Sequence, residues 1–138
     1  MRTEEVIYEN KVLALIIYAR EIEEGICFYT SDDNALQVGK HHYAKGKEIK
    51  AHKHCPVRIE RYESFQEVLY LEEGKVKITF YSDDGRGIDT RILRKGDTIL
   101  LREGGHGFEF LEKTMMLEVK QGPHTPESRE RLEIKDQQ

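Results

Sequence analysis

The chain has 138 residues, of which 35% are charged and 38% hydrophobic, and its formal net charge is −4. This length suits one domain with a real core, because roughly 68% of the unfolded surface is buried at this size. The charge balance offers no basic stripe for a nucleic acid. No apolar run reaches the length of about 18 residues that a membrane-spanning helix needs. We therefore expect a globular protein whose partners include neither nucleic acid nor membrane.

The first 20 residues lack a signal-peptide pattern. Glu4, Glu5 and Glu9 precede the apolar run at residues 12–19, and no cleavage site follows it. We expect a cytoplasmic protein, in which Cys27 and Cys55 stay reduced.

Short β-type segments separated by turn residues fill the first half of the chain. Residues 1–10 predict a polar edge strand or arm, and residues 12–18 predict a strand buried on both faces, with a short helix as the alternative. Further strands are predicted at residues 26–29, 36–43, 48–54 and 57–62, the last because apolar and charged residues alternate there.

The second half continues the pattern up to a polar tail at residues 122–138. Strands are predicted at residues 66–71, 75–81, 88–93, 98–101, 106–110 and 114–120, the first two forming a hairpin around Gly74. About ten short strands with frequent turns predict an all-β sandwich or barrel.

Three histidines and one glutamate form a candidate metal site. His52 and His54 are two residues apart, so on a strand both imidazoles point to one face. Glu67 begins a later strand pattern, and His106 follows two glycines. Imidazole suits Zn, Cu, Fe and Ni, and an added carboxylate keeps the set compatible with Fe(II), Mn or Ni.

The spacing of these residues resembles the cupin superfamily, whose first motif is G-x5-H-x-H-x3/4-E-x6-G. Gly46, His52 and His54 fit its first half, and Glu67 and Gly74 fit its second half. The departure is the gap between the halves, which is twelve residues here, Cys55 through Gln66.

The second cupin motif, G-x5-P-x-G-x2-H-x3-N, is matched more loosely. Gly96 and Gly104 fit, Arg102 stands where proline is usual, His106 comes one residue early, and Phe110 takes the asparagine position. The resemblance implies a double-stranded β-helix, or jelly-roll, barrel over residues 36–121. Residues 1–35 would then be an arm packing on the barrel, and residues 122–138 a tail.

The resemblance also implies a ligand set of His52, His54, Glu67 and His106 around one divalent ion, with Fe, Mn, Ni and Zn as candidates. The competing interpretations are solvated histidines on an edge strand, an exposed glutamate and a loop histidine. Such a site should weaken as the pH falls through about 6, because only neutral imidazole binds metal. Phe108 and Phe110 are interpreted as core residues that also form an apolar wall.

Several functions fit this resemblance. One is a metal-dependent enzyme acting on a small polar molecule such as a sugar or sugar-nucleotide derivative, of the isomerase or epimerase type. The alternatives are a non-catalytic small-ligand-binding cupin and an Fe-dependent dioxygenase. An isomerase needs a base, for which His42, Tyr43 and Tyr62 are candidates. Because cupins commonly pair, we also expect a homodimer, in which the strand at residues 12–18 buries one face against the partner.

Overall fold

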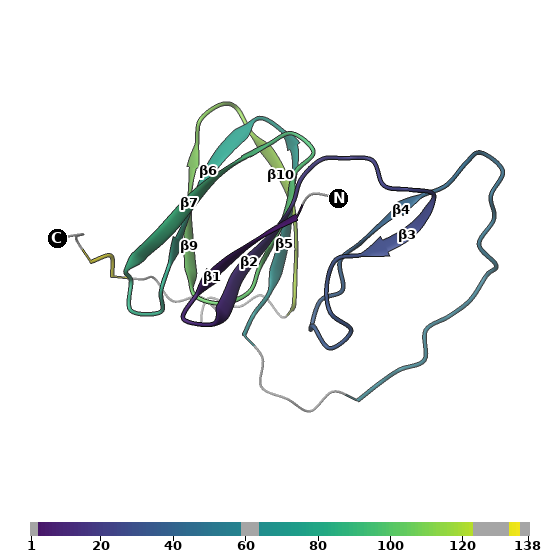
Figure 1. Ribbon diagram of the computed structural model, residues 1–138, viewed down its shortest axis with the longest axis horizontal. Coiled ribbons are helices and arrows are strands. Elements are labelled where there is room, and N and C mark those ends of the chain that lie inside the picture. The colour runs from purple at the N-terminus through teal and green to yellow at the C-terminus, as the bar shows by residue number, and fades with distance from the viewer. Residues whose placement is uncertain (1–2, 59–63, 123–132, 136–138) are drawn as a thin grey trace. The chain divides into compact units, whose positions relative to one another are not determined.

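The computed structural model describes residues 3–58, 64–122 and 133–135, and all regular structure in them is β-strand (Figure 1). The strands are β1 (Thr3–Tyr8), β2 (Lys11–Ile17), β3 (Gly25–Phe28), β4 (Gly39–His42), β5 (Glu67–Glu73), β6 (Lys75–Tyr81), β7 (Gly87–Arg94), β8 (Thr98–Leu101), β9 (Gly105–Phe110) and β10 (Met115–Lys120). The all-β prediction is confirmed. The described residues include no helix that is long and apolar enough to span a bilayer.

Two antiparallel sheets form the main unit of the chain, which comprises Met1–Arg20 and Phe65–Gln138. The larger sheet has the strand order β1-β2-β8-β5-β10, and the smaller one has the order β7-β6-β9. Buried side chains from both sheets join in one hydrophobic core. The unit is therefore a sandwich, which is the arrangement that lets each sheet bury one apolar face.

Alternation along the strands explains how the core is built. In β6, Val76, Ile78 and Phe80 are buried, and the residues between them are half-buried. The period of two sends these three side chains to the face that meets the larger sheet. Strand β2 is different, because every residue from Leu13 to Ile17 is buried. The prediction of a doubly buried strand in this region is confirmed.

An ion pair ties the two sheets together at the β1 and β7 edges. Arg91 Nε on β7 lies 2.7 Å from Glu4 Oε1 on β1. The hydroxyl of Tyr18 donates a 2.6 Å hydrogen bond to the other oxygen of Glu4. The carboxylate therefore has partners on both oxygens, as a partly buried charge requires.

The second unit, Glu21–Ser64, is described by itself. It contains the antiparallel pair β3 and β4, in which Gly25 lies opposite His42 and Phe28 lies opposite Gly39. The predicted division into residues 1–35, 36–121 and 122–138 stays a prediction. Most of the predicted tail lies outside the described residues.

The strand predicted at residues 48–54 is not formed. Residues 44–58 are all exposed and have no regular secondary structure beyond a turn. A strand needs a neighbour that accepts its backbone hydrogen bonds, and the described residues provide none for this segment. Of the strand predicted at residues 57–62, residues 57 and 58 are not in a strand, and the rest lie outside the described residues.

The predicted hairpin around Gly74 is also wrong, although both of its strands exist. β5 belongs to the larger sheet and β6 to the smaller one, so the chain crosses the sandwich at Gly74 instead of folding back. Gly74 has φ +96°, and a Cβ there would clash with the Lys113 carbonyl oxygen. This backbone conformation favours glycine, which makes the abrupt change of sheet feasible.

Gly104, in the connection from β8 to β9, provides a test of this packing. Its φ is +70°, and a Cβ there would clash with the backbone carbonyl oxygen of Tyr81. We expect Gly104→Ala to lower the free energy of unfolding by about 2 kcal/mol. Urea denaturation measures the loss. The control is Gly122→Ala, where a Cβ meets nothing within 4 Å. Equal stability of the two variants would contradict the described connection.

Candidate functional site

Glu67 and His106 meet between the two sheets. Glu67 begins β5 of the larger sheet, and His106 lies on β9 of the smaller sheet, opposite the buried Phe80 of β6. The Nε2 atom of His106 is 2.6 Å from Oε1 of Glu67. Two of the four predicted ligands are therefore in contact. Their contact joins β5 of the larger sheet to β9 of the smaller sheet.

The contact keeps Glu67 ionised. The hydrogen bond from His106 lowers the pKa of Glu67 from its usual 4.5 to about 2, while burial acts in the opposite direction. Only 16% of the Glu67 side chain is exposed, and 31% of the His106 side chain. Because the carboxylate has no proton at neutral pH, Nε2 of His106 carries the shared hydrogen and donates it.

Glu118 on β10 is a site residue that the sequence analysis did not identify. A hydrogen bond to Glu67, together with burial, raises the pKa of Glu118. The register explains the proximity, because Lys120 lies opposite Glu67 and Glu118 is two residues back on the same face. In the sequence, Glu118 alternates with Leu117 and Val119, which indicates that it lies on the opposite face of its strand. This alternation does not identify β5 as the strand beside β10.

An aromatic row continues from His106 along β9. The ring centroids of His106 and Phe108 are 5.3 Å apart, and those of Phe108 and Phe110 are 6.3 Å apart. The three side chains lie on one face of β9, because they are two residues apart along the strand. Both phenylalanines are nevertheless exposed, at 37% and 55%, so they form a wall beside the Glu67–His106 pair and not a closed core.

His52 and His54 lie in the exposed segment of the other unit. Their ring centroids are 5.3 Å apart with the rings at 66°. His52 Nδ1 lies 2.9 Å from the carbonyl oxygen of Lys50. The two imidazoles are thus neighbours, although they are not carried on the strand that the sequence predicted.

The candidate bases are spread over the same unit. His42 is exposed on β4, with Nδ1 2.7 Å from the carbonyl oxygen of Ile22. Tyr43 is half-buried, and its ring lies 5.8 Å from that of His41. Tyr62 lies outside the described residues. Among the described residues, no three His, Cys, Asp or Glu side chains gather closely enough to hold a metal ion.

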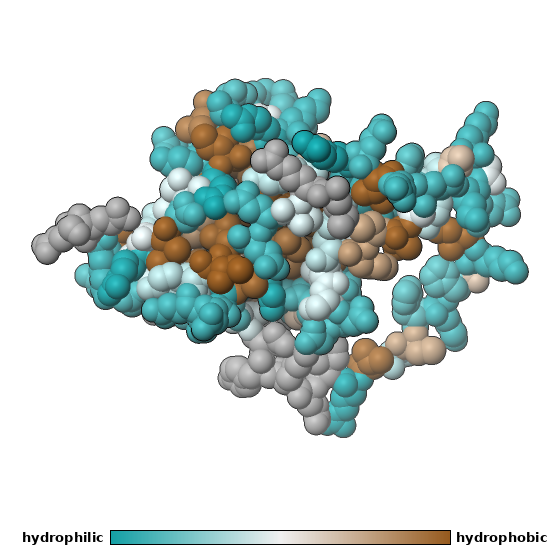
Figure 2. Space-filling view, viewed as in Figure 1, coloured by the Kyte–Doolittle hydropathy of each residue, from teal (hydrophilic) through white to brown (hydrophobic). Residues whose placement is uncertain are grey.

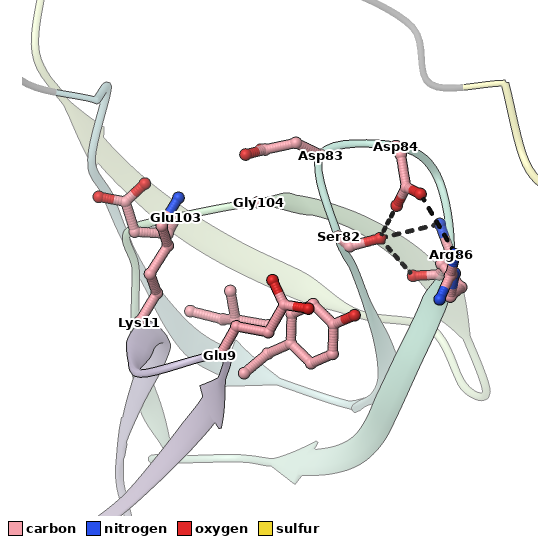
Figure 3. Close-up of a pocket in the computed structure, with 10 residues that line it drawn as sticks. Glu9, Lys11, Ser82, Asp83, Asp84, Arg86, Glu103 and Gly104 are labelled. Atoms are coloured by element: carbon pink, nitrogen blue, oxygen red, sulfur yellow. Dashed lines mark hydrogen bonds and ion pairs between the residues drawn. The ribbon is translucent and has the colours of Figure 1, made fainter.

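A shallow polar pocket opens among the connections at one end of the sandwich (Figure 3). Its volume is about 260 Å³, somewhat less than that of typical ligand pockets. It is lined by Tyr8, Glu9, Lys11, Leu13, Ser82, Asp83, Asp84, Arg86, Glu103 and Gly104. No predicted ligand is among them, so this pocket does not coincide with the Glu67–His106 pair.

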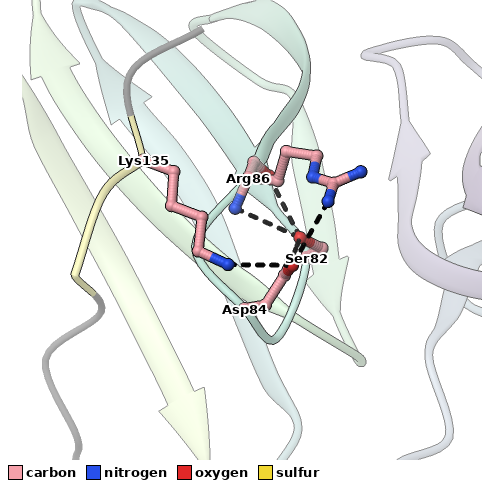
Figure 4. Close-up of polar contacts among 4 residues, drawn as sticks. All are labelled: Ser82, Asp84, Arg86 and Lys135. Carbon is pink, nitrogen blue, oxygen red and sulfur yellow. Dashed lines mark hydrogen bonds and ion pairs between the residues drawn. The ribbon is translucent and has the colours of Figure 1, made fainter.

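Polar contacts stabilise the β6–β7 turn at this pocket (Figure 4). Ser82 donates a hydrogen bond to Asp84, and Lys135 Nζ lies 3.3 Å from the other Asp84 oxygen. The backbone amide of Lys135 also donates to the Gly85 carbonyl, at 3.2 Å. These contacts hold residues 133–135 against the turn. We therefore assign the polar side chains of the turn a structural role.

Comparison of the chain with protein-family models, curated proteins and solved structures found no match.

Proposed function

We propose that this chain is a metal-binding protein of the cupin type that binds a small polar molecule beside the ion. The Glu67–His106 pair carries the proposal. It joins an ionised carboxylate to an imidazole at 2.6 Å, and the two residues come from opposite sheets. Imidazole and carboxylate together suit Fe(II), Mn, Ni and Zn.

The spacing of the pair supports metal binding. With metal–ligand bonds of about 2.1 Å, adjacent donors of an octahedral ion lie roughly 3 Å apart. An ion can therefore replace the shared hydrogen if the two side chains separate by a few tenths of an ångström. His52 and His54 belong to the other unit of the chain, so their part in the ligand set stays a prediction from the spacing of the sequence motif. When bound, the ion supplies a Lewis acid for a carbonyl or hydroxyl oxygen.

A second candidate is a metal-free binding protein. The observation in its favour is the same contact, because the His106 hydrogen already satisfies the Glu67 carboxylate. In this case the aromatic row and the Glu67, Glu118 and His106 side chains would bind the small molecule directly.

Metal titration separates the two candidates. We expect protein stripped with a chelator to bind about one Mn²⁺, Ni²⁺ or Zn²⁺ per chain at pH 7.5, measured by calorimetry and elemental analysis. Glu67→Gln and His106→Ala should each weaken binding at least tenfold, because each removes a ligand of the proposed ion.

The matched control is His41→Ala, which removes an exposed histidine outside the proposed set. It should bind the ion as the wild type does. Unchanged binding by both Glu67→Gln and His106→Ala would contradict the metal proposal, and so would a wild-type protein that takes up no ion.

A further inference from the structure

Strand β10 is the last strand of the larger sheet. Among the described strands, β5 is its only hydrogen-bonded neighbour. Its other edge therefore presents backbone N–H and C=O groups to any strand that can reach it. Natural edges are often protected by inward-pointing charges. β10 instead has two exposed charges of opposite sign, Glu118 and Lys120, which lie on the face opposite to Leu117 and Val119.

The outer face of β10 is apolar and exposed. Leu117 is 53% exposed and Val119 is 54% exposed. They lie opposite Tyr70 and Val68 of β5, so the apolar strip continues onto the neighbouring strand. On the face visible in Figure 2, apolar side chains are exposed among polar ones. Because β10 is the last strand of the sheet, a strand from another molecule that pairs with it would extend this apolar strip.

The charge pattern identifies the strand that fits. When two copies of β10 pair antiparallel about a two-fold axis at Val119, Glu118 of each copy lies opposite Lys120 of the other. Opposite charges directly across strands stabilise a sheet, and like charges destabilise it. An axis at Glu118 instead places the two Glu118 carboxylates opposite each other. An axis at Leu117 places Glu118 opposite Met116, so no cation of the other copy lies directly across from it.

We propose that β10 is a self-pairing edge, through which two copies of this chain join their larger sheets antiparallel about Val119. Each copy then supplies Lys120 to the Glu118 of the other. This edge-to-edge interface differs from the face of the strand at residues 12–18 that the sequence predicts as a partner contact; within the sheet that strand has β1 and β8 on its two sides, so it has no open edge.

Charge reversal tests the pairing. By light scattering at tens of micromolar, the wild type should have twice the 16.2 kDa mass of one chain. Glu118→Lys and Lys120→Glu should each raise the dimer dissociation constant at least tenfold, because two attractive pairs become repulsive. The double variant restores opposite charges and should dimerise again. Glu5→Lys, the same change on the other edge strand β1, should leave the dimer unchanged.

Cysteine cross-linking tests the position of the axis independently of these charges. In a background with Cys27 and Cys55 replaced by serine, Val119→Cys should form an intermolecular disulfide on mild oxidation. Residues directly opposite in antiparallel strands have Cα atoms about 4.5–5.5 Å apart, within disulfide range. Leu117→Cys should not cross-link, because its copy lies roughly 13 Å away.

Several outcomes would overturn the proposal. They are a monomeric wild type, single charge variants that dimerise as the wild type does, a double variant that stays monomeric while folded, and cross-linking at residue 117 in place of 119. Circular dichroism of each variant establishes whether it is folded.

Discussion

Phe80→Ala should lower the free energy of unfolding by about 3–5 kcal/mol, the range for removing a buried aromatic ring from a well-packed core. Phe80 is 1% exposed and lies on β6, the central strand of the smaller sheet. Its ring joins the core that both sheets share. The substitution leaves a cavity that the surrounding strands cannot close without breaking their backbone pairing, so most of the cost remains.

Urea denaturation followed by circular dichroism measures this loss. The matched control is Phe110→Ala on β9, because that ring is 55% exposed. The control should cost less than about 1 kcal/mol. A Phe80 variant as stable as the Phe110 variant would contradict the described core.

His106→Ala should cost about 2 kcal/mol at pH 7, and this cost should disappear as the pH falls. The pKa of Glu67 is lowered from 4.5 to about 2, so its ionised form stabilises the folded state above pH 4.5. That stabilisation is lost as the pH drops from 4.5 toward 2. Because both side chains are partly exposed, solvent screens their interaction. The loss of stability is therefore smaller than the whole pKa shift of Glu67 would give.

Unfolding of wild type and variant between pH 7 and pH 2.5 tests this expectation. The two stability curves should converge at the acidic end, since protonated Glu67 no longer gains from His106. His41→Ala removes an exposed histidine and should run parallel to the wild type throughout. A constant difference in the free energy of unfolding between wild type and His106→Ala over the whole pH range would contradict this. It would show that His106 does not stabilise the fold through the ionised Glu67 carboxylate.

The strands were largely predictable because their signals are local. Alternation at Val76, Ile78 and Phe80, and the continuous apolar run of β2, come directly from contact with a core. The shared face of His106 and Phe108 follows from the same period of two. The pairing of Glu67 with His106 was expected through the spacing of the motif, and these two residues do meet.

What failed depends on neighbours that a single sequence does not identify. The segment at residues 48–54 has the composition of a strand but no partner strand in the described part of the chain. The chain reversal at Gly74 has the sequence of a hairpin, yet its two strands join different sheets. Glu118 becomes a site residue only because β10 lies beside β5. The period of two predicts which face of its strand a side chain lies on, but it does not predict which strand is the neighbour.

The position of β2 within the larger sheet also bears on how the chain folds as it is synthesised. β2 lies between β1, its sequence neighbour, and β8, where Ala14 pairs with Leu101. The β1–β2 hairpin can form early, but its apolar residues have no β8 until residues 98–101 have left the ribosome. Contacts of such long sequence separation are slow to form, and the waiting hairpin is exposed to aggregation. A fragment that ends before residue 98 lacks the strand that joins β2 to β5, so it cannot assemble the larger sheet.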